Sequence, residues 1–165
     1  MSSRSILAGA LLGALAPILA GALLGALALG LAAPAQAALG RAYSSVDSDR
    51  ETMGATLKSI SGSGFTQHTL TLANRSLVTE YTRPDGTVFA VAWTGPGRPD
   101  LRTLLGDHFD VLQADNPRVG KRTRRPLSVN RSDFKVVTGG HSGAFWGVAV
   151  LPALEPASFS ASARR

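Results

Sequence analysis

The sequence predicts an α+β domain in which one or two helices pack on an antiparallel sheet of about five strands. Segments of alternating apolar and polar residues are separated by turn signals, and two other stretches have helical spacing. Their chain order, α-βββ-α-ββ, is typical of an antiparallel sheet with helices packed on it. The 165 residues leave room for one domain, and the absence of Cys means that packing alone must stabilise it.

The first 37 residues have the pattern of a secretory signal peptide. Arg4 precedes an uncharged stretch from residue 5 to residue 40, and Ala35-Gln36-Ala37 is a small-x-small cleavage site. We expect cleavage near Ala37, a single domain over residues 38–155 and a disordered tail over 156–165. The mature protein would then be periplasmic or secreted.

An uncleaved membrane anchor is the alternative reading of the same stretch. A helix over 6–31 would extend roughly 40 Å, more than the ~30 Å hydrocarbon core of a bilayer. Pro17 interrupts the stretch, however, and Gly and Ala are only weakly hydrophobic. In this reading the protein contacts the inner membrane through the leader alone.

The predicted elements begin with a helix over about 49–60. Ser48 and Glu51 fit a capping box, and Met53 and Leu57 follow at helical spacing. Three strands are then predicted from their alternation, and their ranges are Thr66–Leu72, Leu77–Thr82 and Thr87–Trp93. The third strand is apolar on both faces, which predicts a central position covered on both sides.

The second half begins with the clearest helix, over about Asp100–Gln113. Further strand signals lie in Leu127–Val129, Phe134–Thr138 and Ala144–Leu151. The last two are predicted to form a hairpin around a Gly-rich loop, Gly139–Gly143.

The positive charge is concentrated in one loop. Between residues 116 and 132 there are six basic residues and no acidic one: Arg118, Lys121, Arg122, Arg124, Arg125 and Arg131. Such a patch is either a solvated loop or a contact for an anionic envelope surface. We expect no nucleic-acid partner, because the chain is predicted to be exported and no aromatic residue lies between Phe109 and Phe134 to stack on bases.

Residues that could carry chemistry are few. His141 and Ser142 lie in the Gly-rich loop, where His141 could act as a base, but adjacent side chains rarely converge on one proton. A distant acid such as Asp107 is the other possible partner for His141. No two His residues have the i, i+4 spacing of a metal site, so we expect neither metal nor cofactor.

A family resemblance covers about residues 39–154. The residues that carry it are Glu80-Tyr81, Gly86, Val88-Phe89-Ala90-Val91, Trp93, Gly95-Pro96, Pro99-Asp100-Leu101, Leu104-Leu105-Gly106, Phe109, Leu127-Ser128-Val129, Gly139-Gly140-His141, Ala144-Phe145, Gly147 and Leu151-Pro152. In this order they resemble the exported Gram-negative family called domain of unknown function 2844 (DUF2844). The resemblance implies a small periplasmic or secreted protein, and it brings no activity, cofactor or catalytic residue.

Two functions remain open from the sequence. The first is a non-catalytic module that binds an envelope protein, peptide or polymer in a sheet groove beside Trp93 and Trp146, with the loop that carries His141 at its rim. The second is a small hydrolase that uses His141 with Ser142 or a distant acid.

Overall fold

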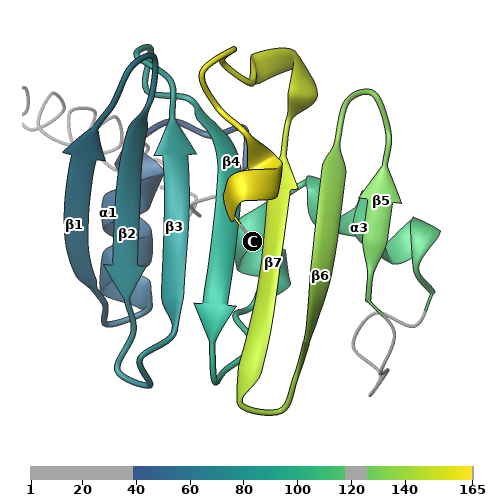
Figure 1. Ribbon diagram of the computed structural model, residues 1–165. Helices are drawn as coiled ribbons and strands as arrows, with labels where there is room; N and C mark the ends of the chain where they lie inside the picture. Colours follow the sequence, from purple (N-terminus) through teal and green to yellow (C-terminus); the bar gives the residue numbers. More distant parts are fainter. Residues whose placement is uncertain (1–38, 118–125, 165) are drawn as a thin grey trace, which may run out of the picture. The chain divides into compact units, whose positions relative to one another are not determined.

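A single antiparallel sheet of seven strands dominates the fold (Figure 1). The protein is described by a computed structural model, which covers residues 39–117 and 126–164. The strand order is β1-β2-β3-β4-β7-β6-β5. The strands are β1 (Thr56–Ser61), β2 (Thr66–Thr71), β3 (Leu77–Thr82), β4 (Val88–Gly95), β5 (Ser128–Asn130), β6 (Lys135–His141) and β7 (Ala144–Val150). The α+β class is therefore confirmed, and the sheet has seven strands where about five were predicted.

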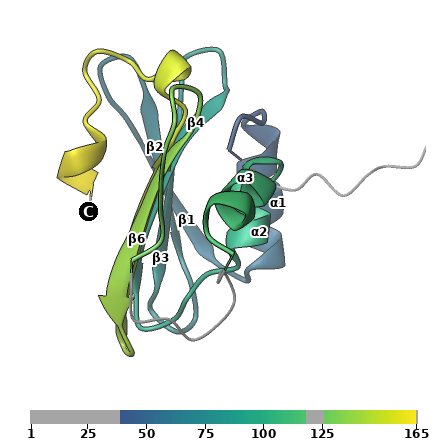
Figure 2. The ribbon, with the colours of Figure 1, turned by 90° about the vertical axis from the view of Figure 1, so that its right-hand side faces the viewer.

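All three α-helices cover the same face of the sheet (Figure 2). They are α1 (Ser44–Thr52), α2 (Leu101–Leu105) and α3 (His108–Asp115). We call this side the helix face. Its core includes Val46 of α1, Leu104 and Leu105 of α2 and Leu112 of α3, all at most 1% exposed.

The C-terminal segment lies on the opposite side, which we call the tail face (Figure 2). After two short 3-10 helices, Pro152–Leu154 (η1) and Ala161–Arg164 (η2), the described chain ends at residue 164. For this segment the sequence predicts a disordered tail over 156–165. Phe159 is only 7% exposed, because its ring packs among Phe65, Tyr81 and Phe89.

The predicted helix over 49–60 is wrong in its second half. Helix α1 ends at Thr52, and Gly54 has a φ of +57°, a conformation that Gly supplies after a helix C-terminus. The chain then turns back as β1. Leu57 and Ile60 fit helical spacing, but in the strand they lie on opposite faces, and Ile60 is 53% exposed.

The second predicted helix is two helices. Asp100 caps α2, since its carboxylate accepts from the backbone N–H of Arg102 (3.0 Å) and the hydroxyl of Thr103 (2.8 Å). Gly106, with a φ of +52°, then separates α2 from α3. The predicted central strand is confirmed, because every residue from 88 to 93 is buried.

The leader predicted over 1–37 lies outside the described residues. Within the described ranges, no helix is long and apolar enough to span a membrane.

Candidate functional site

His141 and Ser142 lie at the exposed tip of the β6–β7 hairpin. The predicted loop is shorter than expected: Gly139, Gly140 and His141 belong to β6, and only Ser142 and Gly143 form the turn. The Nδ1 atom of His141 lies 3.0 Å from the backbone oxygen of Ser142, so the ring contacts the turn rather than a nucleophile.

The proposed acid partner is engaged elsewhere. The carboxylate of Asp107 lies 3.5 Å from the guanidinium of Arg41, and both side chains are exposed. A hydrolase of this type needs a base in contact with its nucleophile and an acid that orients the base. The described contacts of His141 and Asp107 do not form such a chain.

The two Trp side chains lie on opposite faces of the sheet. Trp93 pairs with Gly147 across β4 and β7, whereas Trp146 pairs with Thr94. Because successive side chains of a strand alternate, Trp93 belongs to the helix face and Trp146 to the tail face. A single groove beside both rings, as predicted from the sequence, is therefore wrong.

Each ring packs over a glycine. A Cβ atom added at Gly147 would overlap the indole of Trp93, and one added at Gly139 would lie 2.5 Å from that of Trp146. Trp93 is 5% exposed, while Trp146 is only half-buried. Trp146 is consequently the ring that a ligand can reach.

A groove of about 240 Å³ lies on the tail face over β5, β6 and β7. Its lining includes Val137, Val148 and Val150, with Ala161 of η2 at one side. The polar residues that line it are Ser128, Asn130 and Lys135. Trp146 and Gly139 continue this apolar surface, because each lies two residues from Val148 or Val137 on the same strand face. We call Val137, Gly139, Trp146, Val148 and Val150 the β6–β7 strip.

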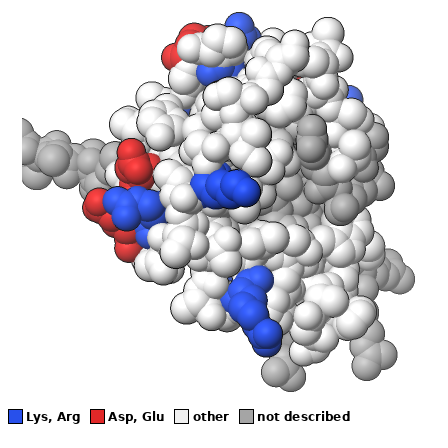
Figure 3. Space-filling model, turned by 60° about the vertical axis from the view of Figure 1, so that its left-hand side comes forward, with Lys and Arg blue, Asp and Glu red and all other residues white. Residues whose placement is uncertain are grey.

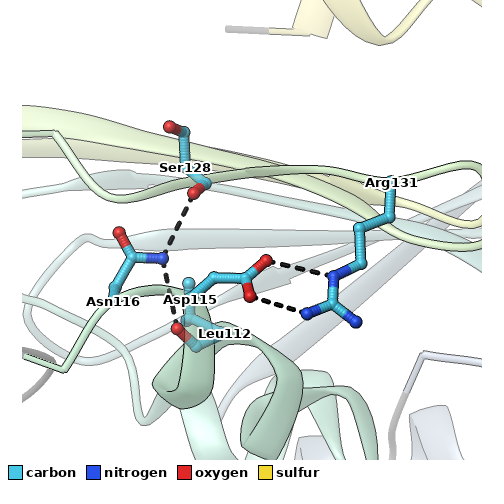
Figure 4. A network of polar contacts seen from close by, with 5 residues as sticks. All are labelled: Leu112, Asp115, Asn116, Ser128 and Arg131. Atoms are coloured by element: carbon cyan, nitrogen blue, oxygen red, sulfur yellow. Dashed lines mark hydrogen bonds and ion pairs between the residues drawn. The ribbon is translucent and has the colours of Figure 1, made fainter.

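Most of the predicted basic patch lies outside the described residues, namely Arg118, Lys121, Arg122, Arg124 and Arg125. Arg131 is described, and it binds the carboxylate of Asp115 through two nitrogens, at 2.6 and 3.1 Å (Figure 4). These hydrogen bonds lower the pKa of Asp115. Arg131 therefore joins the start of the β5–β6 connection to the end of α3, instead of presenting a free cation.

A buried pair of carboxyl groups lies between α1 and the sheet, and the sequence analysis missed it. Asp49 of α1 and Glu80 of β3 are each 1% exposed, and their side chains share a hydrogen bond. Burial raises the pKa of Glu80 well above its ordinary value, and the charge and hydrogen bond of Asp49 raise it further. Glu80 lies two residues from Val78 on the same strand face, and that alternation was the available signal.

His68 is buried beside this pair. Its Nδ1 lies 2.8 Å from the Ser59 hydroxyl and its Nε2 lies 2.9 Å from the Thr82 hydroxyl. Burial lowers the pKa of His68, and the charge of Asp47 opposes that shift. Because both ring nitrogens have partners, His68 has none left for a metal ion. Within the described ranges, no three His, Asp or Glu side chains are placed to hold one.

The comparisons with known proteins place the chain in a family. A family model described as "Protein of unknown function (DUF2844)" matches residues 35–163. No curated protein matches the chain, and no solved structure does. The matched range contains every described strand and α-helix. The chain therefore belongs to the DUF2844 family, as the resemblance in its sequence motifs predicts.

Proposed function

We propose that this protein is exported and acts as a non-catalytic module that binds a protein or polymer of the cell envelope. The observation that carries the proposal is the β6–β7 strip, in which the apolar groove is continued by the half-buried Trp146 on the sheet face opposite the helices. Export is supported by the leader pattern of residues 1–37.

The chemistry of the groove favours recognition over catalysis. Its apolar lining supplies affinity through burial, and a few polar groups at its edge supply orientation, which is the usual composition of a binding site. Lys135 is exposed and forms no ion pair with any residue of the described ranges, so its ammonium is free to contact a ligand.

The binding role is tested by site-specific photo-crosslinking in cells. A photoreactive residue at Val137, inside the groove, is compared with one at Asp110, which is exposed on α3 on the opposite face. We expect adducts of higher mass at position 137 and none at position 110. Adducts at neither position, or the same adducts at both, would contradict binding at the strip.

Export is tested separately, by the N-terminal residue of the protein purified from each cell fraction. We expect Ala38 as the first residue, in the periplasmic or secreted fraction. Full-length protein in the inner membrane would favour the anchored alternative instead.

A further inference from the structure

The two edges of the sheet are protected to different degrees. At the β5 edge, the side-chain amide of Asn116 donates to the backbone oxygen of Ser128 at 3.1 Å, and the Arg131–Asp115 pair lies beside it (Figure 4). These contacts from the end of α3 occupy one outward backbone group of β5, the oxygen of Ser128. Strand β1 forms the opposite edge, and an uncovered edge is a template for pairing with another chain.

The register shows which backbone groups of β1 point outward. The N–H of Gly62 donates to the oxygen of Phe65 at 2.9 Å, which closes the β1–β2 hairpin. Because hydrogen-bonded pairs alternate in an antiparallel ladder, Thr56, Lys58 and Ile60 bond to β2. The remaining β1 residues direct their N–H and C=O groups away from the sheet.

Those outward residues are Leu57, Ser59 and Ser61. Their backbone N–H and C=O groups form no hydrogen bond with any residue in 39–117 or 126–164. The edge thus offers three donors and three acceptors in strand geometry, along a stretch long enough for a short peptide to pair with it.

Two exposed side chains of β1 flank this edge on the tail face. Ile60 is 53% exposed, and the ammonium of Lys58 forms no ion pair with any described residue. Figure 3, in which the β1 side of the molecule comes forward, shows a surface that is mostly uncharged, with isolated basic groups and with acidic groups near the margins of the view. Among the described residues, Lys58 is therefore an unpaired cation beside the apolar side chain of Ile60.

We propose that the β1 edge binds an extended peptide as an eighth strand, and that this peptide carries an acidic residue and an apolar residue two positions apart. Main-chain hydrogen bonds to Leu57, Ser59 and Ser61 supply affinity, as in other cases of strand addition. The peptide residues opposite Lys58 and Ile60 form non-hydrogen-bonded pairs, in which side chains approach most closely. An acid opposite Lys58 therefore gives selectivity. This surface is separate from the β6–β7 strip.

A second copy of the chain fits this edge less well. If the β1 strands of two copies pair antiparallel about a two-fold axis, their outward-pointing residues bond to one another. Lys58 then lies opposite Thr56, Lys58, Ile60 or a glycine of the second copy. None of these provides a carboxylate. A lysine on an edge strand disfavours pairing with a second copy of that strand. The same charge favours a peptide that carries an acidic residue.

The test uses two blocked nine-residue peptides of alternating Thr and Val, one with a Glu and the other with a Lys in place of the central Val. Binding to isotope-labelled protein is followed by amide chemical shifts and hydrogen exchange. We expect shifts and slowed exchange at Leu57, Ser59 and Ser61, with the Lys peptide binding about fivefold more weakly. Lys58→Glu reverses this preference.

Two variants distinguish strand pairing from non-specific binding of the peptide. Ser61→Pro removes one outward N–H at an edge position where Pro is tolerated, whereas Ser61→Ala retains it. We expect Pro to abolish peptide binding and Ala to leave it unchanged, with both variants folded.

Four outcomes would overturn the proposal. They are equal binding of both peptides, unchanged binding by Ser61→Pro, shifts confined to the β6–β7 strip, and no shift at millimolar peptide. Concentration-dependent shifts of β1 without peptide would assign the edge to a second copy instead.

Discussion

On each face of the sheet a Trp ring packs over a glycine of the neighbouring strand, but the two rings differ in exposure. On the helix face Trp93 packs over Gly147, and on the tail face Trp146 packs over Gly139. The first ring is closed in by the core of the helix face, which includes Val91 and Ala149. The second ring remains half-buried.

The difference lies in what covers each ring. Three helices close the helix face, whereas on the tail face the described chain adds only the segment that follows β7 (Figure 2). A glycine beneath an aromatic ring therefore permits tight packing in one case and leaves a flat, reachable ring in the other. The Trp–Gly pair is the same on both faces. The segments that pack over the ring decide whether it belongs to the core or to a candidate binding surface.

The largest expected effect is a difference between two matched substitutions. Gly147→Ala places a methyl group against the indole of Trp93, which has no space to move, and we expect a loss of about 3 kcal/mol in the free energy of unfolding. Gly139→Ala meets Trp146, which can swing toward solvent, at a cost of about 1 kcal/mol. Urea denaturation measures both.

Fluorescence provides the control for this comparison. We expect Gly139→Ala to shift the emission of Trp146 to longer wavelength while the protein stays folded. Equal losses of stability in the two variants would mean that both rings are equally confined, and the distinction between the faces would fail.

The next effect concerns the tail. The ring of Phe159 lies 4.9 Å from those of Tyr81 and Phe89, measured between centroids, so Phe159→Ala removes the main anchor of the tail. We expect a loss of about 2 kcal/mol, below that of a central core Phe because the tail can detach locally. Hydrogen exchange of residues 156–164 should quicken more than that of β4.

The matched control for the tail is Ala163→Ser, at an exposed position of the same segment. It should leave stability and exchange unchanged. If Phe159→Ala had no more effect than this control, the tail would not be held by its aromatic contacts.

Elements with constrained dihedral angles could be predicted from the sequence. Pro84 and Gly86 favour a tight turn at Arg83–Gly86, and the structure has the corresponding bond from the N–H of Gly86 to the oxygen of Arg83 (2.9 Å). Strand β1 was missed because Leu57 and Ile60 satisfy helical spacing, whereas in the strand they lie on opposite faces. The left-handed conformation of Gly54 ends the helix before Leu57. The spacing of apolar residues carries no information about that conformation.

The candidate site was harder to predict because it depends on register. That Trp93 and Trp146 lie on opposite faces follows from the pairing of β4 with β7, which no local pattern specifies. The burial of Phe159 was missed because its neighbours in sequence are small and polar, a composition typical of disordered tails. Long-range packing of one aromatic side chain outweighed that composition.

The smallest effect is a pH dependence that comes from the helix face alone. The pKa of Glu80 is raised in the folded state, so its contribution to stability is complete below about pH 4.5 and is lost as pH rises toward the raised value. Glu80→Gln removes this loss and keeps a hydrogen-bonding group beside Asp49. Because desolvation of the amide offsets part of the gain, we expect the variant to gain roughly 1 kcal/mol over the wild type between pH 5 and pH 8.

His68 contributes in the opposite direction. Its pKa is lowered in the folded state, so its contribution is present above about pH 6.5 and is lost as pH falls. His68 and Asp47 are unchanged in the variant, so the contribution of His68 largely cancels in the difference between variant and wild type. Chemical denaturation at each pH measures that difference. A difference independent of pH would mean that Glu80 is not held protonated by Asp49 and burial.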